Sequence, residues 1–107
     1  MHIQINTDHN IAGREQLAIH VKGVVESVLG RFSDRITRVE VHLSDQNSDK
    51  SGQDDKRCMM EARLKGRQPT AVSHRAASLG DAVDGAIDKL KRSLESTLER
   101  LEDDRKT

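Results

Sequence analysis

Lysine and arginine side chains are concentrated in one part of this 107-residue chain. From Lys56 to Arg75 there are six basic residues and one acidic residue, Glu61, although the whole chain has 18 residues of each sign and no net charge. Such a local excess can bind phosphate groups by charge and by paired hydrogen bonds from arginine. Because Phe32 is the only aromatic residue, bound RNA would be recognised by backbone and shape rather than by base stacking. The alternative is a solvated sheet face with charged, protective edges.

Residues that could bind a metal or a cofactor do not occur at the required spacing. The five histidines never form an HxH or HxxxH pattern, and Cys58 has no CxxC partner. The chain also has no GxGxxG, GxxxxGKS or GxxxxGKT loop for nucleotide phosphates. We therefore expect no metal, no cofactor and no catalytic residue, and we predict that the protein is not an enzyme.

Three groups that could take part in catalysis have simpler interpretations. Cys58 falls on the inward face of a predicted strand, where burial would raise the pKa of its thiol and make it unreactive. His74 is expected to be a partly buried histidine on the next strand rather than a general base. Asp54 and Asp55 fall in a polar loop, and general acid–base catalysis needs fixed geometry. They are therefore interpreted as solvated charges.

Six segments of regular structure must position these side chains. Alternation of apolar and polar residues predicts strands, and apolar residues at spacings of three and four predict helices. In chain order, the pattern predicts a strand at 2–6, a helix from Arg14 that Gly30 can end, strands at 35–43, 57–65 and 70–76, and a helix with an apolar stripe from Leu79 to Leu101. The segment 44–55 has no apolar residue and is predicted to be a solvated loop.

The last helix has the clearest boundary signals. Ser78 and Asp81 have the form of a capping box at its start. A stripe of about 23 residues spans ~34 Å. That length exceeds the width of four strands at ~4.8 Å each, so the helix should project beyond the sheet. The charged tail at 103–107 should fray.

The order of the elements predicts an α+β fold, β-α-β-β-β-α, in a single domain that covers residues 1–102. The last three strands are expected to form an antiparallel meander, and the first strand returns to the sheet through the first helix. Both helices should cover the apolar face of the four-stranded sheet. The polar face would then carry Arg38, Glu40, His42, Arg63, Lys65 and Arg75.

The chain has no features of a secreted or membrane protein. Cys58 stands alone, so no intramolecular disulfide can form. The N-terminal residues have neither an apolar run nor a basic lead-in, and no segment approaches ~18 apolar residues. We expect a cytoplasmic protein with no membrane partner.

Two stretches of sequence resemble a known family. RFSDRI at 31–36, after the first helix, and AVDGAIDKLKRSL at 82–94, in the second, resemble the ribosome hibernation-promoting factor and ribosome-associated inhibitor A family. The resemblance covers about residues 1–100. It implies a factor of stress or stationary phase that binds the 30S subunit and its 16S rRNA near the decoding region and the tRNA channel. Such a factor silences translation by occupying that space.

The resemblance also implies RNA-binding residues. Arg35 matches the arginine of the DRI motif, and Lys89 and Arg92 match basic residues of the second stretch. The alternation of the strands adds four residues on the polar sheet face, which are Arg38, Arg63, Lys65 and Arg75. We predict that these residues contact rRNA, and we expect no DNA partner.

An alternative function remains open because the net charge is zero. A protein-interaction module of the same fold could self-associate through the second helix without binding ribosomes. The sequence leaves undecided the oligomeric state and whether ribosomes are paired. An enzyme would need a pocket lined by His74 and carboxylates.

Overall fold

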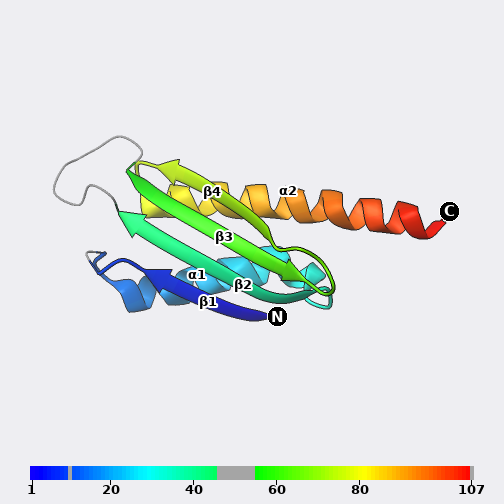
Figure 1. Ribbon diagram of the computed structural model, residues 1–107. Coiled ribbons are helices and arrows are strands. Elements are labelled where there is room, and N and C mark those ends of the chain that lie inside the picture. The colour runs from blue at the N-terminus through cyan, green and yellow to red at the C-terminus, as the bar shows by residue number, and fades with distance from the viewer. Residues whose placement is uncertain (10, 46–54, 107) are drawn as a thin grey trace.

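The computed structural model describes residues 1–9, 11–45 and 55–106, with side chains up to Leu101 (Figure 1). The predicted α+β order is confirmed, with one short 3-10 turn added between the first helix and the second strand. The elements are β1 (His2–Thr7), α1 (Arg14–Leu29), η1 (Gly30–Phe32), β2 (Ile36–Asp45), β3 (Lys56–Leu64), β4 (Thr70–Ala76) and α2 (Leu79–Lys106).

The four strands form one mixed sheet in the order β1-β2-β3-β4. β1 and β2 are parallel, because α1 carries the chain back to the starting edge between them. β2, β3 and β4 form the predicted antiparallel meander. The parallel register places Ile3 beside Val39 and Ile5 beside Val41, so the apolar residues of β1 and β2 share one face.

Both helices lie on that apolar face (Figure 1). The buried core is aliphatic, as the near absence of aromatic residues requires. Because successive side chains of a strand point to opposite faces, every second residue of β2 and β3 enters the core. The fully buried residues include Val39 and Val41 of β2, Cys58, Met60 and Ala62 of β3, Val21, Val25 and Leu29 of α1, and Ala86, Leu90 and Leu94 of α2.

The start of α2 has the Ser78 half of the predicted capping box. The Ser78 hydroxyl accepts a hydrogen bond from the backbone N–H of Asp81 at 3.1 Å, which satisfies one of the free amides of the first turn. The helix has 28 residues, and at ~1.5 Å per residue it is about 42 Å long. Its C-terminal part projects beyond the sheet, as predicted (Figure 1). The backbone stays helical to Lys106, and fraying of 103–107 remains a prediction.

α1 ends at Leu29 with Gly30 as its C-cap, as expected, but among the described residues the two glycines with positive φ lie elsewhere. Gly30 has the right-handed values φ −55° and ψ −37°, so the chain continues from Leu29 directly into the η1 turn. Gly13, before α1, and Gly66, in the β3–β4 turn, have φ of 66° and 69°. Such values favour glycine because it has no Cβ.

The prediction that Asp55 is a solvated loop residue is wrong. Its side chain is 6% exposed, and its carboxylate lies 3.0 Å from the Lys56 ammonium, which also lies 3.3 Å from Asp45. The Lys56 ammonium offsets the negative charge of both carboxylates. β2 and β3 accordingly stay paired as far as Asp45 and Lys56. The hydrogen bond with Asp55 is the largest cause of a raised pKa at Lys56. Asp54 and the rest of 46–54 lie outside the described residues.

Candidate RNA-binding interface

The structure distributes the predicted RNA-binding residues over three surfaces. Arg38, Arg63 and Arg75 lie on the face of the sheet that turns away from the helices, which we call the outer face. Arg35 and Lys65 lie at the end of the sheet beside the β3–β4 turn. Lys89 and Arg92 are exposed residues of α2. Among the described residues, these side chains do not form a single continuous cationic surface.

Four basic residues surround the β3–β4 turn, and one of them, Arg63, also belongs to the outer face. They are Arg35, Arg63, Lys65 and Arg67, which we call the turn cluster. The backbone N–H of Lys65 donates to the carbonyl oxygen of Arg35 at 3.0 Å, so the two segments lie side by side. The left-handed Gly66 closes the turn between Lys65 and Arg67. An open groove of about 600 Å³ runs along this turn.

The charges of the turn cluster are largely unopposed. Lys65 and Arg67 are exposed, and within the described part of the chain neither forms an ion pair. Arg63 has only a distant partner, Glu61, at 3.9 Å. Arg67 was not among the predicted contacts, although the basic run 56–75 contains it.

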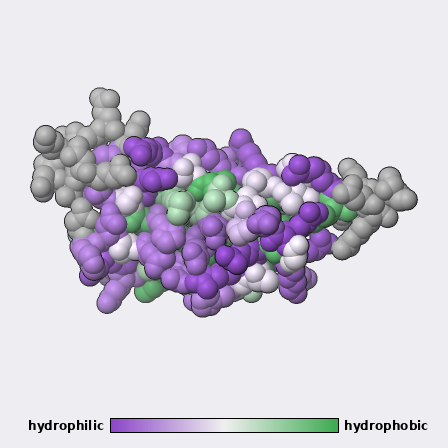
Figure 2. Space-filling view, in the orientation of Figure 1, coloured by the Kyte–Doolittle hydropathy of each residue, from purple (hydrophilic) through white to green (hydrophobic). Residues whose placement is uncertain are grey.

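The middle of the outer face is acidic. β2 and β3 pair so that Glu40 stands directly opposite Glu61. Glu40 lies 2.8 Å from Arg38 and 3.6 Å from His42, and Arg38 also donates to the side-chain oxygen of Gln4. Figure 2, drawn from this side, shows mainly hydrophilic side chains and a small hydrophobic area near the centre. Because Glu40 and Glu61 lie between the basic residues at the two ends of the face, they separate the positive charges there.

The opposite end of the outer face carries a second cationic pair. Arg57 and Arg75 stand opposite each other on β3 and β4, and neither forms an ion pair with any residue that the structure describes. Arg57 lies six positions before Arg63 on β3, a distance of about 20 Å at ~3.3 Å per residue. A partner that contacts both ends must therefore bridge the acidic middle.

The two predicted residues of α2 have other partners. The Lys89 ammonium donates to the backbone carbonyl of Ser73 at 2.9 Å, and so covers part of the free edge of β4. Arg92 forms an exposed ion pair with Asp88 at 3.0 Å, one helical turn earlier. Such exposed pairs are weak, typically under ~1 kcal/mol, so Arg92 can still exchange its partner.

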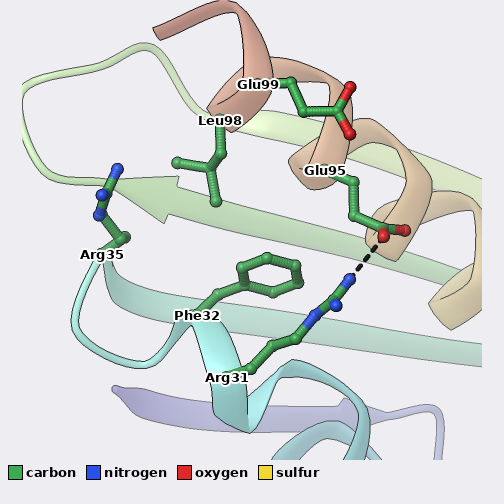
Figure 3. Close-up of a pocket in the computed structure, with 6 residues that line it drawn as sticks. All are labelled: Arg31, Phe32, Arg35, Glu95, Leu98 and Glu99. Atoms are coloured by element: carbon green, nitrogen blue, oxygen red, sulfur yellow. Dashed lines mark hydrogen bonds and ion pairs between the residues drawn. The ribbon is translucent and has the colours of Figure 1, made fainter. Parts of the chain in front are cut away.

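A cleft lies between η1 and the C-terminal half of α2 (Figure 3). It has a volume of about 310 Å³, and we call it the η1–α2 cleft. The Arg31 guanidinium lies 2.5 Å from the carboxylate of Glu95 and 4.5 Å from the centre of the Phe32 ring. The six lining residues are Arg31, Phe32, Arg35, Glu95, Leu98 and Glu99. Of these, sequence reasoning had identified only Arg35 as a contact residue.

Cys58 and His74, two of the groups considered for catalysis, are packed as predicted. Cys58 is fully buried, and burial raises the pKa of its thiol to about 12, so the thiol stays protonated at neutral pH. His74 is half-buried, and its ring lies where a Cβ on Gly85 of α2 would be. The described residues contain no group of three or more His, Cys, Asp or Glu arranged to hold a metal ion. Among them, no helix is long and apolar enough to cross a membrane.

Comparison with known proteins identifies one family and a common fold. The family described as sigma 54 modulation protein / S30EA ribosomal protein matches residues 3–102. The structure of the Protein Y N-terminal domain from Thermus thermophilus is similar with a TM-score of 0.72 and 21% identity, over 91% of this chain and 99% of that one. A ribosomal subunit interface protein from Coxiella burnetii has a TM-score of 0.66 and 17% identity, over 92% and 99%. No match was found among curated proteins.

Proposed function

Because this chain belongs to the sigma 54 modulation protein / S30EA ribosomal protein family, we propose that it is a ribosome-associated factor that silences translation. In this proposal it acts in the cytoplasm under stress or in stationary phase. It binds the 30S subunit through 16S rRNA, near the decoding region and the tRNA channel. The family match supports this assignment because it covers residues 3–102, which include most of α2 and all of the sheet except His2.

The turn cluster is the part of the surface that we propose contacts rRNA most strongly. Its basic side chains lack close carboxylate partners within the described structure, so they do not have to break strong ion pairs to bind phosphate. Arginine can also contact a phosphate through two parallel hydrogen bonds. This concentration of unopposed charge, in a chain whose net charge is zero, is the observation that carries the proposal.

The remaining predicted contacts would contribute unequally. Arg75 has no ion-pair partner among the described residues and adds a second contact at the far end of the outer face. Arg38 and Arg92 share their charge with Glu40 and Asp88, so their net attraction for phosphate is smaller. Lys89 would have to leave the Ser73 carbonyl to bind RNA. The proposal therefore ranks the turn cluster above α2 as an RNA contact.

Co-sedimentation with 30S subunits and 70S ribosomes tests the proposal. At low salt the wild-type protein should pellet with 30S subunits, and the association should weaken as salt rises, because each phosphate contact releases counterions. The double variant Lys65→Glu, Arg67→Glu should bind at least about tenfold more weakly, because it replaces two phosphate-attracting charges by two repelling ones. A tenfold loss corresponds to about 1.4 kcal/mol of binding free energy.

The double variant Arg14→Glu, Lys22→Glu is the matched control, because it reverses the same charge on exposed residues of α1. It should retain binding within about threefold, which is less than 1 kcal/mol. Absence of the wild-type protein from the ribosome pellet at low salt would refute the proposed function. Equal weakening by both double variants would refute the assignment to the turn cluster.

Self-association through α2 is a second candidate function. Leu98 and Leu101 continue the apolar stripe into the projecting part of the helix and stay partly exposed there. A molar mass that rises with protein concentration in light scattering, without any dependence on RNA, would favour this alternative. A constant monomer mass would exclude it.

A further inference from the structure

The turn cluster adjoins the η1–α2 cleft, which is lined by two arginines and two glutamates. Arg35 belongs to both, since its backbone carbonyl accepts from Lys65 of the turn and its side chain lines the cleft. Inside the cleft, Phe32 and Leu98 lie in the middle, with Arg35 on one side and Arg31 on the other (Figure 3). Two guanidinium groups therefore flank an apolar floor at the end of the proposed RNA-binding surface.

The Arg31 guanidinium is held in place by the aromatic ring of Phe32 as well as by a carboxylate. Its guanidinium lies over the face of Phe32 at 4.5 Å, a cation–π contact that holds the group without using its N–H donors. Those donors are directed to Glu95, at 2.5 Å. If Glu95 moved away, the contact with Phe32 would keep Arg31 positioned in the cleft.

The Arg31–Glu95 ion pair is exposed enough to be exchanged. The two side chains are 56% and 37% exposed, and ion pairs of this kind contribute little because water and salt screen them. A phosphate can bind the same guanidinium through two oxygens. Glu95 is therefore a competitor that an RNA phosphate can displace from Arg31. Glu99 adds a second carboxylate to the same cleft.

We propose that the η1–α2 cleft is a further phosphate-binding subsite for RNA, in which Arg31 and Arg35 contact the backbone and Glu95 competes with the phosphate for Arg31. The identity of the polyanion as RNA rests on the proposed function. By this competition, Glu95 lowers the affinity of the protein for RNA. The cleft adds contacts from η1, which the turn cluster alone does not include.

The test is the variant Glu95→Gln, which keeps the size of the side chain and removes the competing charge. Its affinity is measured by titration against 30S subunits and against a short RNA hairpin, each at several salt concentrations. We expect binding about three- to tenfold tighter than the wild type. We also expect a steeper salt dependence, by about 0.7–0.9 in the slope of log K against log salt, since one more phosphate is contacted.

Two further variants separate the subsite from a general charge effect. Glu26→Gln makes the same charge change on α1, where Glu26 is exposed and forms no ion pair with the described residues, and it should leave the affinity within about twofold. Arg31→Ala combined with Glu95→Gln should lose the gain of Glu95→Gln. Thermal unfolding of each variant verifies that the fold is retained.

Each pattern of results decides between the two proposals. Equal gains from Glu95→Gln and Glu26→Gln, or a gain that survives Arg31→Ala, would overturn the subsite. If the wild type fails to bind 30S subunits but Glu95→Gln binds the hairpin in an Arg31-dependent way, the subsite stands and the proposed function falls. If no variant binds either RNA, both are refuted.

Discussion

Gly85, near the start of α2, provides a sharp test of how closely this helix packs on the sheet. Helix propensity alone predicts that Gly85→Ala stabilises the protein by about 0.8–1 kcal/mol. The structure adds a contribution of the opposite sign, which lowers the free energy of unfolding. A Cβ at Gly85 would overlap the Cγ, Cδ2 and Nε2 atoms of the His74 ring on β4. His74 itself is half-buried between the strand and the helix.

The size of the effect follows from these two terms. Inserting a methyl group into a packed site costs about 1–3 kcal/mol, from which the propensity gain of about 1 kcal/mol is subtracted. Gly85→Ala should therefore lower the free energy of unfolding by up to about 2 kcal/mol. In α1, a Cβ on Gly23 would meet no atom within 4 Å. Gly23→Ala should raise the free energy of unfolding by about 0.5–1 kcal/mol, so the two variants should differ by about 1–3 kcal/mol.

Urea unfolding monitored by circular dichroism measures both variants under the same conditions. The midpoints should move in opposite directions with unchanged m-values, which indicates a change in stability alone. The combination of Gly85→Ala with His74→Ala should recover stability relative to Gly85→Ala, because the obstructing ring is removed and contacting residues are coupled. If Gly85→Ala stabilises the protein as much as Gly23→Ala, the close packing of α2 on β4 is refuted.

Two further predictions concern a helix cap and the buried thiol. Ser78→Ala should lower the free energy of unfolding by about 1 kcal/mol, because the Asp81 amide loses its acceptor at 3.1 Å; an unchanged urea midpoint would contradict this. Burial raises the pKa of Cys58 from 9.0 to about 12, so the unfolded chain releases the thiol proton at lower pH than the native protein does. Between pH 9 and about pH 12, stability should therefore fall with rising pH by about 1.4 kcal/mol per unit from this group. Urea unfolding at several pH values measures that slope, and Cys58→Ala should reduce it.

Much of the fold could be predicted because the relevant patterns are local. Val39, Val41 and Leu43 alternate with polar residues along one strand, and Cys58 and Met60 take every second position along the next, with Met59 between them. The five alternate residues are all buried in the structure. A strand places alternate side chains on one face whatever the rest of the chain does, so these core positions follow from sequence spacing. The limits of the polar loop were less well predicted, because Asp55 is buried by an ion pair with Lys56 that hydropathy does not reveal.

The candidate site could be predicted only in part. Counting charges between 56 and 75 identified the basic segment, including the turn cluster residues of β3 and the turn. Strand alternation placed Glu40 on the polar face, but it did not show that the β2–β3 register sets Glu40 opposite Glu61, where the two divide the outer face. Sequence spacing also did not reveal the pairing of Arg31 with Glu95, two residues 64 positions apart in the chain.

The amino-acid sequence by itself determined the order of helices and strands, the face of each that is buried, and the places where basic residues are abundant. Only the tertiary structure decided which of those basic residues have no carboxylate close enough to offset their charge. The physical reason is that periodicity is a property of neighbouring residues in the chain, whereas the attraction between charges depends on their distance in space. That distance is set by strand register and by the packing of α2 against η1.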